Sequence, residues 1–421
     1  MPPISNPLAC ALAAAVLASA SGVPAAHAQT SASANAPVLT LADALDLAGS
    51  ASPNIDAADA GVRAAGAARR VAALRPNPLL NADIENVGGS RAYNEIEAPK
   101  QTVSVGVPVE LGGKRSARIA VADAQGNRAQ IERVVAGADL RVAVTQAYVE
   151  ALAADRRLAT ARDQAAIAAE AVRAAHVRVV AGRASPLEEQ RAEVLRISAD
   201  AAVDRAARLA DLARANLGRR IGRPATGALD EAWFDRVDSY GPSQLDAGSS
   251  LAVASARADE KAADAQLRLA RSQRLPDVTV SAGLRRLPIN NDVAAVFGVS
   301  VPLPFFNSGT SSIAQAGAER DRATALRRAA ELENEQAIGQ AQADVANAAA
   351  AARTAAGPSL AAAQEAARIA RIGYREGKFG QLDLLEAERT LADTRSAAID
   401  ALAAFHNAQA QLDRLTASAK D

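Results

Sequence analysis

An internal duplication is the feature that most constrains how this chain can fold. Residues 182–186 (GRASP) are matched by residues 377–381 (GKFGQ), and the two leading glycines stand about 195 residues apart. Residues 106–109 (GVPV) are matched by residues 300–303 (SVPL) at nearly the same spacing. Matched segments in one order and at one spacing predict two copies of a single structural unit, each close to half of the chain.

The duplication divides the chain into a leader, two repeats and a linker. We expect the first repeat at residues 29–218 and the second at 249–421, with a linker rich in Gly, Pro and Asp at 219–248. Residues 1–28 carry no Asp, Glu, Lys or Arg, and they end in Ala-His-Ala, which is typical of a secretory signal. Cys10 lies too early in this segment for lipoprotein cleavage, so we expect neither a lipid anchor nor a disulfide in the mature chain.

Each repeat contains two segments in which apolar and polar residues alternate. Such alternation predicts strands at about 80–88 and 102–110 in the first repeat, and at about 276–285 and 295–304 in the second. Their length of about ten residues suits a strand that crosses an outer membrane at a tilt. The alternation alone fits equally well two half-buried hairpins on a soluble core.

Long helices surround these strands. No proline occurs between residues 116 and 180, and apolar residues follow one another there at alternating spacings of four and three, which predicts a helix with a coiled-coil seam. The second repeat carries the same pattern up to Tyr374, with Arg353 as its one interruption. Gly357-Pro358 should kink this second helix, because proline removes a backbone donor and clashes with the preceding turn.

Composition supports a mainly α fold with a small β part. Hydrophobic residues make up 49% of the chain but aromatic residues only 3%, and Lys plus Arg equals Asp plus Glu at 47 each. The balance of charge argues against a nucleic-acid partner. Four strands are too few to close a membrane barrel, whose smallest bacterial form has about eight, so strands that cross a membrane would have to share a barrel with other copies of the chain. Three copies would supply twelve strands.

Over essentially its whole mature length the chain resembles the TolC-type outer-membrane efflux proteins. The resemblance rests on the duplicated unit and on residues 373–377 (GYREG) followed by 382–387 (LDLLEA). Residues 108–115 (PVELGGKR) are similar to the version found in the subgroup that serves heavy-metal cation pumps. The resemblance implies a homotrimer in the outer membrane of a Gram-negative bacterium, with a twelve-stranded barrel, a periplasmic helical tunnel, and a periplasmic adaptor that joins it to a resistance-nodulation-division pump of the inner membrane.

The resemblance also implies roles for residues beside the two turns. A gate at the periplasmic entrance would use a tyrosine before the second turn and acidic residues after both turns: Tyr374, Glu188, Asp383 and Glu386. The turns would contact the adaptor through Gly182, Arg183, Gly377, Lys378 and Phe379. Phe379 stands where some members have a basic residue. A gate closed by a salt bridge from this position would therefore need Lys378 or Arg375 to supply the positive charge.

Motifs for catalysis and metal binding do not occur in the sequence. The mature chain has only His176 and His406, and it has no cysteine, no phosphate-binding loop and no nucleophile elbow. We therefore expect a passive duct with no cofactor and no bound metal, not an enzyme. Two alternatives remain open: the same duct serving drugs or other organic compounds, and a soluble periplasmic coiled-coil scaffold.

Overall fold

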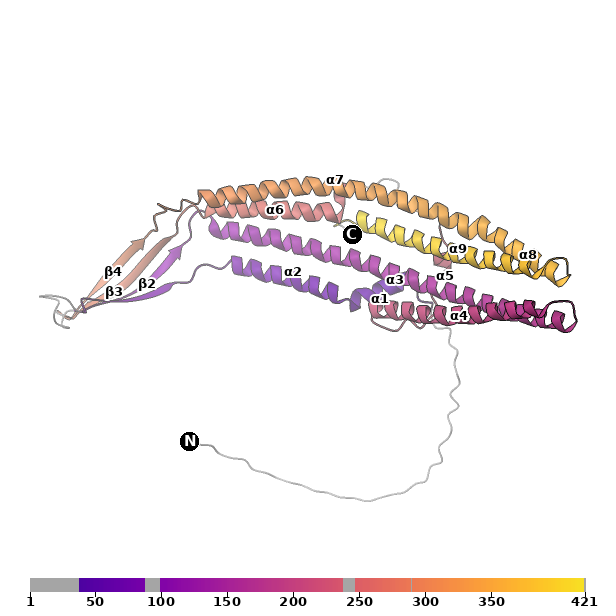
Figure 1. Ribbon diagram of the computed structural model, residues 1–421. Helices are drawn as coiled ribbons and strands as arrows, with labels where there is room; N and C mark the ends of the chain where they lie inside the picture. The colour runs from indigo at the N-terminus through magenta and orange to yellow at the C-terminus, as the bar shows by residue number, and fades with distance from the viewer. Residues whose placement is uncertain (1–37, 88–98, 238–246, 289, 420–421) are drawn as a thin grey trace, which may run out of the picture. The chain divides into compact units, whose positions relative to one another are not determined.

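The computed structural model describes residues 38–87, 99–237, 247–288 and 290–419, so the expected secretory signal lies outside the described residues. Long helices lie beside one another and carry a small sheet (Figure 1). The first repeat comprises α1 (Leu41–Ala51), α2 (Pro53–Ala72), β1 (Leu79–Glu85), β2 (Lys100–Val109), α3 (Lys114–Val180) and α4 (Pro186–Ile221). The short α5 (Glu231–Phe234) and η2 (Ala247–Ser249) follow.

The second repeat has a similar order of elements, with one helix before its strands in place of two and with a break in its long helix. It comprises α6 (Leu251–Ser272), β3 (Val278–Leu287), β4 (Asp292–Ser300), α7 (Thr310–Thr354), the π-helical turn η3 (Ala355–Ser359), α8 (Leu360–Arg375) and α9 (Gln381–Thr416). The expected mainly α class with a small β part is confirmed. Within the described ranges, none of the helices combines the length and the apolar character needed to cross a bilayer.

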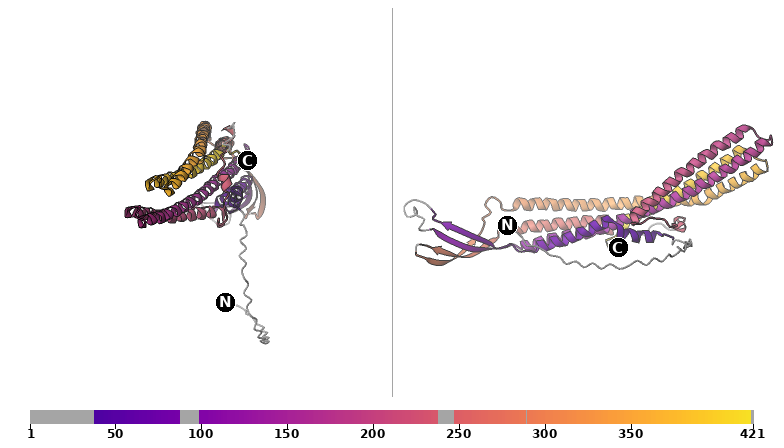
Figure 2. Two further views of the ribbon diagram at one scale, coloured as in Figure 1. Left: turned by 90° about the vertical axis from the view of Figure 1, so that its right-hand side faces the viewer. Right: turned by 90° about the horizontal axis from the view of Figure 1, so that it is seen from below.

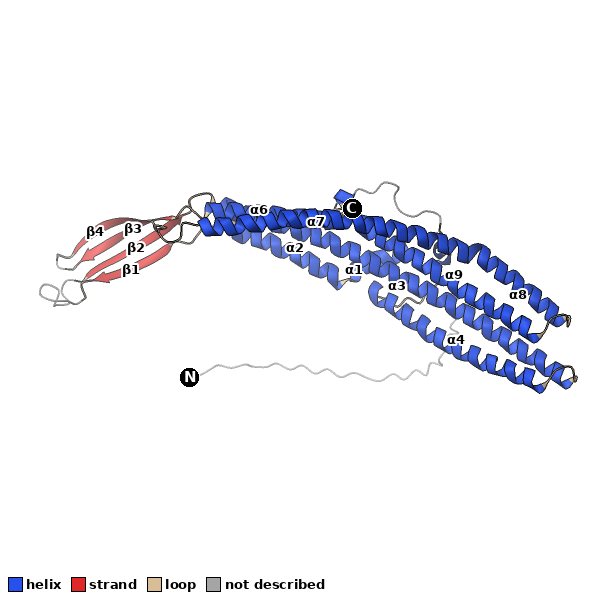
Figure 3. Cartoon of the chain, turned by 45° about the horizontal axis from the view of Figure 1, so that its top comes forward, coloured by secondary structure: helices blue, strands red, loops and turns tan. Residues whose placement is uncertain are grey.

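The helix α3 sets the distance between the sheet and the helical turns. It runs for 67 residues without interruption, which corresponds to about 100 Å at 1.5 Å per residue. Strand β2 precedes it and the turn to α4 follows it, so the sheet and this turn lie at opposite ends of one helix (Figure 3). All positions of the expected apolar seam from Leu140 to Val179 are buried or half-buried, because α4 and α9 pack along this face.

The largest core lies midway along α3. There Tyr148 and Leu152 of α3 pack with Leu217 of α4, Val345 of α7 and Leu402 of α9, all buried. Alanine fills most of the remaining core positions, and its small side chain lets these helices approach closely. The core therefore joins the two repeats to one another and does not form two separate centres.

An aromatic cluster fixes α5 to this core. The imidazole of His406 stacks on the Trp233 ring at a centroid distance of 4.1 Å, and its Nε2 lies 2.9 Å from the carbonyl oxygen of Phe234. Burial lowers the pKa of His406, and the carbonyl of Phe234 only partly opposes this effect. The hydroxyl of Tyr148 donates to the carbonyl of Leu39 at 2.7 Å, which joins the start of the described chain to the same region.

The second repeat is interrupted where the sequence predicts a kink. Gly357, with φ −98° and ψ −106°, leaves the helical region inside a π-helical turn that also contains Pro358. A π-turn shifts the hydrogen-bond register by one residue and so accommodates the missing proline N–H. The seam continues beyond it through Ala363, Ala367 and Ala370, which are buried.

The four strands form one antiparallel sheet in the order β1-β2-β3-β4. Residues that pair directly across an antiparallel ladder lie on the same face. One face is apolar and exposed, and it carries Leu80, Ile84, Val103, Val105, Val107, Val109, Val280, Leu284, Val293, Phe297 and Val299. The other face carries polar side chains, among them Glu85 and Arg285, whose charged groups lie 3.8 Å apart.

Two glycines, Gly283 and Gly298, lie on the polar face of the sheet, where there is little room for a side chain. A Cβ at Gly283 would overlap the backbone of Val103 and Ser104, and one at Gly298 would lie 2.7 Å from the Ser281 hydroxyl. Glycine at such positions allows a sheet to bend toward the side on which side chains are absent. The apolar face is therefore the outer side of the bend.

The strand ends differ by a few residues from the expected ones. Strand β1 ends at Glu85 and not near residue 88, because Asn86 takes a left-handed conformation with φ 65°. Strand β4 ends at Ser300 and not near 304, because Pro302 and Pro304 have no N–H to donate to a ladder. Strand β3 reaches Leu287, which pairs with Asp292 at the tight end of the second hairpin.

Candidate functional site at the helical turns

The turns α3–α4 and α8–α9 are built in the same way. Gly182 follows the end of α3 with φ 70°, and Gly377 follows the end of α8 with φ 71°. In each turn the next residue donates its N–H to a carbonyl five residues earlier: Arg183 to Arg178, and Lys378 to Gly373, both at 2.8 Å. This Schellman arrangement requires a left-handed residue at the glycine position, which only glycine adopts without strain.

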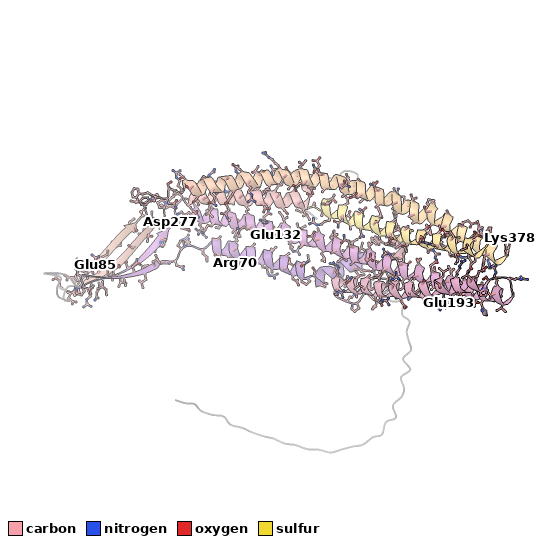
Figure 4. The ribbon with its side chains drawn as sticks, in the orientation of Figure 1. Arg70, Glu85, Glu132, Glu193, Asp277 and Lys378 are labelled. Atoms are coloured by element: carbon pink, nitrogen blue, oxygen red, sulfur yellow. The ribbon has the colours of Figure 1, made fainter. Side chains whose placement is uncertain are left out.

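The turns expose a small surface that carries both charged and aromatic side chains. Arg183 is exposed, and Lys378 pairs with the neighbouring Glu376 at 2.6 Å at the far end of the helices (Figure 4). Phe379 is 42% exposed, and its ring packs on Gly373, where a Cβ would overlap it. Phe379 is thus both part of the surface and part of the packing that holds the second turn.

Tyr374 connects the two helical hairpins. Its side chain is buried, and the guanidinium of Arg178 in α3 lies over its ring at 5.1 Å from the centroid. Ala174 of α3 packs against the same cluster. The hydroxyl of Tyr374 is buried and has no hydrogen-bond partner among the residues that the structure describes.

Glu188 lies in the first turn of α4. Its carbonyl accepts a hydrogen bond of 3.4 Å from the side chain of Gln381, the first residue of α9. Its Oε2 is buried and, within the described part of the chain, unpaired. The two turns, about 195 residues apart in sequence, therefore lie side by side, as the ends of the two helix pairs show in Figure 2.

Asp383 and Glu386 lie on the exposed side of α9. The carboxylate of Asp383 accepts a hydrogen bond of 2.9 Å from the N–H of Gly380, so it caps the N-terminus of α9. Glu386 is exposed one turn further along, and the residues between them that face the partner helix are apolar, such as the buried Leu384. The structure thus places both carboxylates on one face near the turn and gives Asp383 a local role in the helix.

Two charged pairs near the turns did not emerge from the sequence. Arg371 of α8 forms a two-pronged ion pair with Glu388 of α9, whose side chain is only 5% exposed, and this bond raises the pKa of Arg371. His176 of α3 contacts Glu189 of α4 at 2.8 Å through its Nδ1. The available signal for the first pair was an acid at an otherwise apolar seam position of α9, since Leu384 and Leu391 flank Glu388 on the buried face.

The charges at this end do not form a metal centre of the ordinary kind. In the ranges that the structure describes, no group of three or more His, Cys, Asp or Glu side chains has an arrangement suited to a metal ion. The site therefore consists of direct contacts between two helix pairs, with carboxylates on the exposed side of α9. Among the described residues, the Tyr374 hydroxyl and Glu188 Oε2 are buried there without partners.

The fold and this site together define a class of protein. Paired long helices end in matching turns, and at their other end they carry a sheet whose outer face is apolar and exposed, as in a channel subunit held in a membrane by strands. The chain belongs to the outer membrane efflux protein family, whose model matches residues 44–223 and 244–418. It is an outer-membrane efflux channel protein, and its helices lie on the periplasmic side of that membrane.

Individual relatives agree with this assignment. The cobalt-zinc-cadmium resistance protein CzcC of Cupriavidus metallidurans is 31% identical over 393 residues, which cover 90% of each chain. The nickel and cobalt resistance protein CnrC of the same organism is 33% identical over 295 residues, 68% of this chain and 70% of that one.

Solved structures of lower sequence identity share the fold. The outer membrane protein VceC of Vibrio cholerae superposes with a TM-score of 0.72 at 19% identity, covering 90% of this chain and 96% of that one. A membrane protein of Pseudomonas aeruginosa superposes with a TM-score of 0.75 at 18% identity, covering 90% of both chains.

Proposed function

We propose that this protein is the exit duct of a tripartite efflux system for heavy-metal cations. The observation that supports this substrate most strongly is the match to a cobalt-zinc-cadmium resistance protein over 90% of both chains. The duct would conduct its substrate passively.

A homotrimer is the proposed assembly. In a single chain the outer edges of β1 and β4 lack a neighbouring strand within the described sheet. Unpaired strand edges in lipid are unfavourable by several kcal/mol per backbone group, roughly, so β1 of one copy should pair with β4 of the next. Three copies give a closed barrel of twelve strands, with the apolar face toward lipid and the polar face toward the lumen.

The periplasmic entrance is the proposed site of gating. Tyr374 and Glu188 hold buried polar atoms that lack partners in the described chain, and opening of the helix pairs would expose both to water or to new partners. Asp383 and Glu386, repeated in three copies, would line the entrance with carboxylates that attract cations.

A periplasmic adaptor is the proposed partner at the turns. The surface it would contact is that of Gly182, Arg183, Gly377, Lys378 and Phe379. An inner-membrane pump of the resistance-nodulation-division class would supply the energy through this adaptor. Metal selection would then belong to the pump and only weakly to the duct.

Complementation of a deletion strain tests the proposed substrate. Cells that lack this protein should become sensitive to cobalt, zinc or cadmium and should accumulate the metal, and the intact chain should restore tolerance. A panel of organic antibiotics and dyes serves as the comparison. Unchanged metal tolerance together with sensitivity to organic compounds would assign the duct to a different substrate class while leaving its role in efflux intact.

A further inference from the structure

Charged side chains on the polar face of the sheet gather at the end that lies away from the helices. Figure 4 shows Glu85 at this end and Asp277 at the helical end. In the described strands, the pairing places the charged residues of this face in the two rows nearest the hairpin turns: Asp83, Glu85, Lys100, Arg285 and Asp292. The described rows closer to the helices carry uncharged residues on this face, such as Ser104 and Ser281.

Acids and bases of this face occupy different strands. Asp83 and Glu85 lie on β1 and Asp292 on β4, the two edge strands of the sheet. Lys100 and Arg285 lie on the central strands β2 and β3. In the proposed trimer, β1 of one copy pairs with β4 of the next, so the carboxylates of two copies would meet at each seam. The bases would lie between the seams, and charge would alternate around the outer end of the lumen.

Hydrogen bonding and charge hold Arg285 in place across three strands. Its Nε donates to the hydroxyl of Thr102 at 3.0 Å, and a terminal nitrogen of its guanidinium lies 3.8 Å from a carboxylate oxygen of Glu85. Thr102 is buried, and the side chain of Arg285 is itself only 32% exposed, so the guanidinium lies close to the surface of the sheet. Because a guanidinium stays protonated at ordinary pH, Arg285 supplies a permanent positive charge at a fixed position.

A fixed positive charge on this face has a direct effect on cations that pass it. Asp83 lies in the same row of cross-strand pairs as Arg285, with Thr102 between them. Carboxylates that line a narrow pore concentrate cations, and conduction requires that the ions bind weakly enough to leave. The charge of Arg285 opposes the field of Asp83 and Glu85 and so weakens the retention of cations at this end.

We propose that Arg285 determines the ion selectivity of the outer end of the duct, by limiting how strongly Asp83 and Glu85 retain cations as they leave. The proposal rests on the trimeric barrel proposed above, whose lumen the polar face would line. It is independent of the carboxylates at the periplasmic entrance, because α3 alone places about 100 Å between the sheet and the turns. This distance is many times the Debye length of about 10 Å in 0.1 M salt.

Reversal potentials across planar bilayers test the proposal. Full-length trimers of the unmodified chain and of Arg285→Gln are compared in a gradient of dilute KCl. We expect Arg285→Gln to raise the permeability ratio of K⁺ over Cl⁻ by about twofold or more, because each copy loses a positive charge at the outer end. Block by La³⁺ added on the side of the hairpin turns should last longer. In about 1 M salt, where the Debye length is about 3 Å, both differences should decrease.

The neighbouring arginine provides a matched control. Arg286 lies opposite Gln101 and Val293 on the apolar face, so Arg286→Gln removes the same charge from the side that would face lipid and should leave the permeability ratio unchanged. Arg285→Lys keeps the charge but not the planar guanidinium, and it should retain the selectivity of the unmodified trimer. If Arg285 had only a structural role, Arg285→Lys would change the permeability ratio as Arg285→Gln does.

A second variant tests the same field from the opposite direction. Glu85→Gln leaves the charge of Arg285 without its nearby carboxylate and should lower the permeability ratio of K⁺ over Cl⁻. This variant keeps the proposal testable if Arg285→Gln forms no trimers. An unchanged ratio in Glu85→Gln would then refute the proposal.

The results separate this proposal from the proposed function. Equal permeability ratios in the unmodified and Arg285→Gln trimers would refute the role of Arg285, and the complementation of metal tolerance would still stand as the test of the duct. A change in Arg286→Gln without a change in Arg285→Gln would show that the other face lines the lumen. The proposed barrel arrangement would then fail together with the proposal.

Discussion

The guanidinium of Arg178 lies over the ring of Tyr374, 5.1 Å from its centroid, and so connects the end of α3 in the first repeat to the end of α8 in the second. A cation–π contact of this kind contributes about 0.5–2 kcal/mol. Arg178→Ala should weaken the closed contact between the turns and increase the basal conductance of the reconstituted trimer in planar bilayers. Arg173→Ala, which removes only a pair within α3, is the control, and equal conductance in the two variants would contradict the assignment.

The Arg371–Glu388 pair should be asymmetric in its response to mutation. Arg371→Ala leaves a buried carboxylate without its partner and should lower the free energy of unfolding by about 1–3 kcal/mol. Glu388→Gln removes the charge but keeps a polar group, and the half-exposed Arg371 can turn to water, so its effect should be smaller. Thermal unfolding in detergent measures both, with Arg368→Ala on the exposed face of α8 as a control that should not change the midpoint.

The stability of the aromatic cluster should depend on pH through His406. Burial lowers the pKa of this imidazole in the folded chain below its ordinary value of about 6.5. The unfolded chain therefore binds a proton first as the pH falls, so the stability present above about pH 6.5 decreases below it. Trp233 fluorescence during thermal unfolding should report this decrease, because its ring stacks on His406.

Substitution of each histidine separates the two possible sources of that pH dependence. His406→Gln should remove it, whereas His176→Gln should leave it in place, because His176 is exposed near the turns. A pH dependence that survives in His406→Gln and disappears in His176→Gln would show that the second histidine is responsible.

Gly283 should be required for assembly of the sheet. A Cβ there would overlap the carbonyl of Val103 and the backbone of Ser104, so Gly283→Ala should lower the yield of heat-modifiable trimers in the outer membrane. Gly126→Ala, in an open part of α3, is the matched control and should raise stability by about 0.5–1 kcal/mol. Normal trimer yield in Gly283→Ala would mean that the sheet relaxes without needing glycine.

Asp383 and Glu386 should influence ion selectivity if they line the entrance. Asp383→Asn combined with Glu386→Gln should reduce cation selectivity and block by multivalent cations, because fewer carboxylates face the pore. Asp383 also caps α9, so Asp383→Ser, which retains a capping oxygen without the charge, controls for loss of the cap. Selectivity equal to that of the unmodified trimer would place both carboxylates on the outer surface.

The sequence predicts the elements better than their contacts. Local spacing of residues can be read directly from a single sequence. It predicts the duplication, the unbroken α3, the kink at Gly357 and the alternation of the strands. The Arg178–Tyr374 and Arg371–Glu388 contacts depend on the rotation of one helix against another, and an Ala-rich seam constrains that rotation weakly because its side chains are nearly uniform. The alternation predicts too late an end for β4, because it continues beyond Pro302 while the ladder ends at Ser300.

The sequence contains a signal for the capping role of Asp383. Gly380 followed three residues later by an acid is a helix-start signal. The resemblance to a known family implies a gate role for Asp383, and it does not imply this local function. One carboxylate can serve both, and the Asp383→Ser control distinguishes them.

The two repeats, equal in outline, differ in stiffness. In the first repeat, α3 runs without interruption from the sheet to the periplasmic turn. In the second repeat, the corresponding long helix is broken at Gly357 by a π-turn. Bending is easiest where backbone hydrogen bonding is already irregular, so we expect α8 to bend against α7 more readily than one half of α3 bends against the other. Movement at the periplasmic end would then be easier in the second repeat than in the first, so two units of similar outline would divide support and motion between them.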